Sequence, residues 1–290
     1  MNRSWKVRMA ALLATAAALA ALLPAASASA ARLDQAGDKA PATYRYLLRL
    51  EKDEALIASA RADRATVSAQ LPADAFLARM VQRLELENAN YRYREAVRTE
   101  QYDMLQIAVV PDLARQVIAV SPPGLAAAER DTFDAWYSIW RLAGIDEYNL
   151  VRIHPHGLDG AQPSGQLQSY YQAAASHYQL DWTYLASINF IESDFGRVNG
   201  PSSAGALGPM QFMPATWDAY GQGGDVNNPK DAIDAAARYL FLHGALRNID
   251  AALFAYNHDN DYVQAVKDYA DAIRQDPTWL DRLYYWNTTG

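Results

Sequence analysis

The amino-acid sequence predicts an all-α protein, and three observations support this fold class. Apolar residues recur at helical spacing along most of the chain, no stretch shows a convincing strand-like alternation, and proline or short polar residues mark several helix starts. The chain has 290 residues, of which 51% are hydrophobic and 20% charged. This composition is ordinary for globular proteins and excludes disorder along the whole chain, because so much apolar surface can form a core.

The first thirty residues are typical of a secretory signal peptide. Arg3, Lys6 and Arg8 precede an uncharged run of about 15 residues, 9–23, which is short for a membrane-spanning helix of roughly 20. Small residues over 26–30 then offer cleavage sites. We therefore expect an exported protein of the periplasm or cell envelope, with a net charge near −10 and no membrane anchor after cleavage. The alternative is an uncleaved membrane anchor.

Residues 31–164 are predicted to form a helical accessory region, whose role the sequence does not indicate. Leu47 and Ile57 mark the apolar face of its first helix, and Phe133 and Trp136 mark that of its last. The helices are expected over 43–64, over 72–98, over 102–120 with an interruption at Pro111, and over a stretch that ends near Gly144. Residues 146–165 are rich in Gly, Pro and His and are expected to form a loop or linker.

The composition excludes several classes of function. A net charge of −7 argues against a nucleic-acid partner, and the absence of cysteine excludes disulfides, thiolate zinc sites and a cysteine nucleophile. His154 and His156 are a weak metal candidate, since no EF-hand spacing or His-Glu-x-x-His helix accompanies them. We expect no metal and no cofactor, and the sequence points to no particular protein partner.

The most informative element is a helix that begins after Asp181, a plausible N-cap, and ends at Gly196. Glu192 falls on the apolar face of this helix, whereas Asp194 points to the opposite side. Burial of a carboxylate is costly and raises its pKa, which suits a general acid near neutral pH. The alternative is a structural glutamate whose charge is satisfied by Arg197 or by a helix end.

Short motifs follow this helix in a fixed order. A stretch rich in small residues, 200–209, leads to Gln211, whose amide can both donate to and accept from sugar groups. Asn228 and the proline after it are expected to start another helix. A short element ends in Ala-Tyr-Asn at 255–257, and Asn260-Asp261 is expected to cap the last helix.

These motifs resemble those of soluble lytic transglycosylases, which have a lysozyme-like fold and cleave peptidoglycan. The matching motifs are Glu192-Ser193, Gly205-Ala206-Leu207-Gly208-Pro209-Met210-Gln211, Met213-Pro214 and Ala255-Tyr256-Asn257. The Gln211–Pro214 run, and Asn228-Pro229 with Asp231-Ala232-Ile233, are also similar to the membrane-bound B type of the same activity. The resemblance implies a lysozyme-like domain over 165–276, followed by a C-terminal tail over 277–290. The chain departs from the family at Pro209, where Leu is more usual, and at His258-Asp259, where Ala-Gly often follows.

The resemblance also implies a role for each matching residue. Glu192 would be the single catalytic acid and then base, acting between N-acetylmuramic acid and N-acetylglucosamine in glycan strands and leaving a 1,6-anhydro end. Ser193, Met210 and Gln211 would contact the substrate. Tyr256 would hydrogen-bond and orient Glu192, and Asn257 would shape the same wall.

Two alternatives stay open at this point. A lysozyme-type hydrolase on the same fold would need a second carboxylate to activate water, and Asp194, Asp218 and Asp225 are the residues to consider. A non-catalytic glycan-binding module would keep the fold without the reaction. The retention of Glu192 on an apolar face argues against this module, because an inactive copy would readily replace a destabilising carboxylate.

Overall fold

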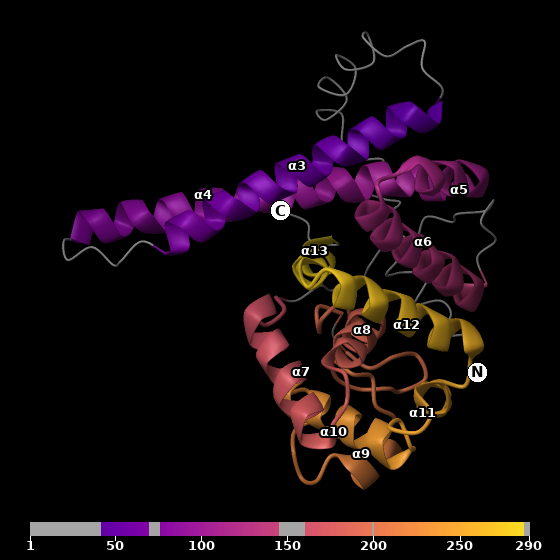
Figure 1. Ribbon diagram of the computed structural model, residues 1–290. Helices are drawn as coiled ribbons and strands as arrows, with labels where there is room; N and C mark the ends of the chain where they lie inside the picture. Colours follow the sequence, from indigo (N-terminus) through magenta and orange to yellow (C-terminus); the bar gives the residue numbers. More distant parts are fainter. Residues whose placement is uncertain (1–41, 70–75, 145–159, 199, 287–290) are drawn as a thin grey trace. The chain divides into compact units, whose positions relative to one another are not determined.

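The computed structural model describes residues 42–69, 76–144, 160–198 and 200–286, and the predicted signal peptide lies outside these residues. The regular elements of the described residues are α-helices, so the predicted all-α class is confirmed (Figure 1). The helices are α3 (Ala42–Ser68), α4 (Phe76–Ala108), α5 (Pro111–Val120), α6 (Pro123–Ala143), α7 (Ser164–Tyr178), α8 (Trp182–Ser193), α9 (Pro214–Tyr220), α10 (Pro229–Leu242), α11 (Ile249–Tyr256), α12 (Asn260–Gln275) and α13 (Thr278–Trp286).

The chain forms two compact units, and the first contains α3, α4 and α5. The two long helices α3 and α4 lie side by side (Figure 1), and α5 packs against both. Leu50, Ile57 and Tyr93 are among the side chains buried between these helices. The sequence predicted a helix end near Arg98, but α4 continues to Ala108 because its buried apolar positions persist and no Gly or Pro interrupts them.

The second unit begins at Pro123 and contains α6 to α13. Helix α6 packs along α12, and the ring of Trp136 meets that of Trp286 edge-on at 5.3 Å between centroids. This unit therefore starts well before the catalytic domain predicted from residue 165. Its end also differs from the predicted tail, because residues 278–286 form helix α13 with Trp279 and Leu283 buried.

Helix α8 lies in the middle of the second unit, in contact with α7, α10, α12 and α13 (Figure 1). Asp181 caps it as predicted, accepting a hydrogen bond from the Thr183 amide at 3.0 Å. Arg274 of α12 donates to the same carboxylate at 2.7 Å and so fixes the start of α8 against its neighbour. Residues 185–193 are all buried, so neighbouring helices surround the end of α8 rather than covering a single stripe.

The first unit holds a pair of buried carboxyl groups between α3 and α4. Asp53 is 2% exposed and Asp103 is 8% exposed, and their side chains are hydrogen-bonded to each other. Burial, with the adjacent Asp103 as a second cause, raises the pKa of Asp53 to about 8. Arg49 lies 3.7 Å from Asp103 and partly offsets the effect of burial on that carboxyl.

We expect Asp53→Asn to stabilise the first unit above about pH 8. The pKa of Asp53 in the folded state, about 8, lies above its ordinary value of 3.8. Folding therefore favours the protonated carboxyl, and stability falls as pH rises between these two values. An asparagine cannot ionise, so the melting temperature of the variant should fall less between pH 5 and pH 9. Asp63→Asn, which removes a half-exposed partner of Arg92, is the control and should keep the wild-type pH dependence.

Candidate active site

Glu192 lies in the last turn of α8 and is only 8% exposed. The phenol of Tyr262, in the first turn of α12, donates a hydrogen bond to Glu192 Oε1 at 2.9 Å. Burial raises the pKa of Tyr262 well above its ordinary value, and the charge of Glu192 adds to this effect. Tyr262 is therefore a neutral donor at physiological pH, and its hydrogen bond stabilises the charged carboxylate.

Tyr256 lies beside Tyr262 but makes a different bond from the one expected. The two rings are nearly parallel, at 4° and 6.4 Å between centroids. The phenol of Tyr256 donates to the carbonyl oxygen of Met210 at 2.7 Å. Tyr262, which the motif comparison did not single out, therefore makes the contact with Glu192 that was expected of Tyr256. Tyr256 instead ties the end of α11 to the turn that carries Met210.

Met210 and Gln211 belong to a tight turn closed by Leu207 and Phe212. These two residues exchange backbone hydrogen bonds of 2.8 and 2.9 Å. Gly208 begins the turn with φ of +69°, and a Cβ there would lie 1.9 Å from the carbonyl oxygen of Val226, so only glycine fits. The side-chain amide of Gln211 donates to the Gly208 carbonyl at 2.8 Å, which holds the half-buried glutamine against its own turn.

Ser193 was expected to contact the substrate, but the structure buries it completely. Its hydroxyl donates to the Pro209 carbonyl at 2.5 Å and accepts from the Gly196 amide at 2.9 Å. Asn189, one turn earlier on α8, donates to the same Pro209 carbonyl at 2.8 Å. The contacts of Ser193 are therefore internal and join α8 to the 207–212 turn. Asn257, half-buried, is the C-cap of α11.

Asp194 was expected to point away from the apolar face of α8, and this expectation is wrong. The helix ends at Ser193, and Asp194 adopts the left-handed conformation, with φ of 51°, as its C-cap. This turn of the backbone buries the Asp194 carboxylate completely, 3.3 Å from the guanidinium of Arg197. Arg197, considered as a partner for Glu192, therefore forms an ion pair with Asp194.

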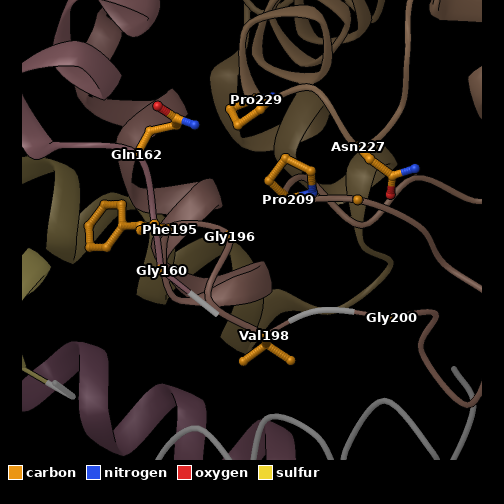
Figure 2. A pocket seen from close by; sticks show the side chains of 11 residues that line it. Gly160, Gln162, Phe195, Gly196, Val198, Gly200, Pro209, Asn227 and Pro229 are labelled. Carbon is orange, nitrogen blue, oxygen red and sulfur yellow. The ribbon is translucent and has the colours of Figure 1, made fainter. Parts of the chain in front are cut away.

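A pocket of about 460 Å³ adjoins the end of α8. Phe195 and Gly196 line one part of it, and Pro209 lines another. Figure 2 shows the amide groups of Gln162 and Asn227 at opposite sides of the view, well separated from each other. Glu192 is not among the residues that line this pocket. Amides offer both donors and acceptors, which suits an uncharged polar ligand.

The site thus combines the buried Glu192 carboxyl group, a neutral phenol donating to it and a rigid turn held by backbone hydrogen bonds. Among the residues that the structure describes, no cluster of three or more His, Asp or Glu side chains is arranged to hold a metal ion. The class that this site defines is a helical domain with a buried carboxyl group that accepts a hydrogen bond from a phenol.

Comparison with known proteins finds a family model that matches this domain. Residues 169–276 match the family model described as Transglycosylase SLT domain, which confirms the predicted resemblance for this part of the chain. The chain is also 30% identical over 150 residues to the membrane-bound lytic murein transglycosylase F of Thiobacillus denitrificans. That match covers 49% of this chain but only 30% of the relative's length. No solved structure matches the chain.

We expect Ser193→Ala to lower the stability of the second unit. The substitution removes a donor to Pro209 and leaves the Gly196 amide without this acceptor, and such losses at buried sites cost roughly 1–3 kcal/mol. Urea unfolding of the variant measures the loss. Ser203→Ala, at an exposed position, is the matched control and should leave the midpoint unchanged. An unaltered midpoint for Ser193→Ala would contradict the structural role of this hydroxyl.

Proposed function

We propose that this protein is a peptidoglycan lytic transglycosylase in which Glu192 is the single acid and base. The observation that carries the proposal is the buried Glu192 carboxyl, hydrogen-bonded by Tyr262 inside an SLT domain. The name of the 30% identical relative, a lytic murein transglycosylase, supports the same activity. A purely structural role for Glu192 accounts less well for this arrangement, because burying a carboxyl group costs folding free energy and a structural role gives nothing in return.

In the proposed reaction Glu192 begins protonated and donates its proton to the glycosidic oxygen between N-acetylmuramic acid and N-acetylglucosamine. The bond from the anomeric carbon to this oxygen breaks, and the 6-hydroxyl oxygen of the same muramic residue bonds to that carbon. The proton of the hydroxyl returns to Glu192, so the enzyme ends as it began and no water is consumed. The Tyr262 phenol stabilises the carboxylate between the two proton transfers.

The positions of the other carboxylates support a mechanism with one acid. Asp194 is buried in its ion pair with Arg197. Asp218 is exposed on the short helix α9, and Asp225 accepts a hydrogen bond from the Asn227 amide in the turn before α10. An inverting hydrolase would need a carboxylate roughly 6.5–9.5 Å from Glu192 with room for a water molecule between them. If Glu192 is the single catalytic carboxyl group, the 6-hydroxyl of the muramic residue is the favoured nucleophile, because it is held at high effective concentration.

We also propose that the enzyme acts in the cell envelope after export. The expected signal peptide over residues 1–30 supports this, as does the peptidoglycan substrate. Within the helices that the structure describes, none has the length and apolar character needed to cross a membrane.

We expect Glu192→Gln to abolish the clearance of a peptidoglycan suspension while leaving the fold intact or more stable. An amide of the same shape cannot donate the proton, and a neutral group costs less than a charge at a buried position. Turbidity and melting temperature are measured on the same preparations. Asp218→Asn, an exposed carboxylate removed in the same way, is the control and should keep wild-type activity. Glu192→Gln activity within about threefold of wild type would refute the assignment, since removal of a general acid costs 10²–10⁴-fold.

The products distinguish a transglycosylase from a hydrolase. Attack by the 6-hydroxyl gives 1,6-anhydromuramyl ends, each lighter by one water than the hydrolysed equivalent. Digestion in ¹⁸O-labelled water, followed by mass spectrometry, should leave these ends unlabelled. Label at a reducing end would instead identify a hydrolase and require a second catalytic carboxylate.

A further inference from the structure

Helix α8 ends in a strained turn directly after Glu192 and Ser193. Three consecutive residues have positive φ, with values of 51° at Asp194, 60° at Phe195 and 85° at Gly196. Only the last is glycine, and side chains other than glycine disfavour this conformation. Such a turn persists only where its surroundings hold it in place. Its geometry decides where the final turn of α8, and with it Glu192, is directed.

Contacts within the turn supply part of that support. The Val198 amide donates to the Ser193 carbonyl at 2.9 Å, which closes the loop behind the helix end. Asp194 and Arg197 form a buried ion pair, with Arg197 only 5% exposed. A buried pair of this kind depends on groups around it that keep water out and fix its geometry.

Helix α13 provides the surrounding contact through Tyr284. The Arg197 guanidinium lies over the Tyr284 ring, 4.2 Å from its centroid, and the Phe195 ring packs against the same tyrosine at 5.7 Å. Tyr284 itself is 8% exposed. One side chain of α13 therefore covers both the ion pair and the central residue of the strained turn. This helix begins at Thr278, beyond the residues matched by the family model.

We propose that α13 is part of the catalytic unit and that Tyr284 is a positioning residue for Glu192. The inference rests on the proposed function of Glu192. Tyr284 acts through Arg197 and Phe195, which it holds in the conformation that fixes the end of α8. Without the ring, water reaches the ion pair and the turn relaxes, so the carboxyl group loses its alignment with the glycosidic oxygen. Misalignment slows proton transfer, whereas the 207–212 turn keeps its own backbone hydrogen bonds, so KM for the glycan should change little.

The test compares Tyr284→Ala, Tyr284→Phe and Tyr91→Ala in the full chain. Tyr284→Ala should lower kcat by roughly ten- to a hundredfold, the effect of a misplaced reacting group, and leave KM within about twofold. Tyr284→Phe keeps the ring over Arg197 but loses the hydrogen bond of the phenol with that side chain, so it should restore most of kcat. Tyr91→Ala removes an exposed tyrosine ring from α4 and should behave as wild type. Rates are taken below the melting transition of every variant, so that unfolding does not contribute.

A second variant and hydrogen exchange test the role of Tyr284 even if Tyr284→Ala is unstable. If Tyr284→Ala does not fold, Tyr284→Leu fills a similar volume without an aromatic face and should show the same loss of kcat. Hydrogen exchange over residues 193–198 should be faster in the alanine or leucine variant of Tyr284 and unchanged in Tyr91→Ala. Wild-type kcat in the folded variant, or unchanged exchange, would overturn the positioning role. An inactive wild-type protein would instead refute the proposed function, and the exchange measurement would still decide the role of Tyr284.

Discussion

The need to keep one carboxyl group buried and oriented governs the arrangement of the C-terminal unit. Helix α8 is enclosed by four other helices, and Glu192 lies at its end, where polar partners can reach it. Tyr262, at the start of α12, donates a hydrogen bond to Glu192. Tyr256, at the end of α11, donates to the carbonyl of Met210 and so links α11 to the 207–212 turn. The short connection between α11 and α12 therefore brings both phenols to one place, and the carboxyl group gains a donor without being exposed to water.

Glu192 and Asp194, two residues apart, have different partners because helix α8 ends between them. Glu192 is still helical, whereas Asp194 follows the last helical residue in a left-handed conformation. Helical periodicity correctly predicted the burial of Glu192. It could not predict the position of Asp194, because this residue lies beyond the last helical residue. The ion pair of Asp194 with Arg197 neutralises the charge nearest to Glu192 in sequence. The arginine that the sequence suggested as a partner for Glu192 thus pairs with Asp194 instead.

The parts of the fold that depend on neighbouring residues were predictable from the sequence. The caps at Asp181 and Asn228 and the helix start at Pro229 are local choices, and the structure has them where expected. The interruption expected at Pro111 is the start of α5. Contacts between distant segments were not predictable. Tyr262 fits the apolar pattern of a helix, so nothing local distinguishes it from a core aromatic, and the burial of Ser193 depends on a carbonyl sixteen residues away. Helix α13 was missed because its role follows from what it packs against.

The two departures from the family pattern can be understood through the bonds that the backbone makes. In the 207–212 turn, the carbonyl of Pro209 accepts hydrogen bonds from Ser193 and Asn189. The backbone hydrogen bonds that close the turn need no amide at position 209. Proline lacks only that amide, so Pro209 preserves every contact to α8. At the second departure, Asp259 caps α12 by accepting from the Asp261 amide at 2.9 Å. The cap starts the helix at Asn260 and thereby places Tyr262 in its first turn, facing Glu192. Both departures therefore leave the geometry around the carboxyl group intact, and the second helps to create it.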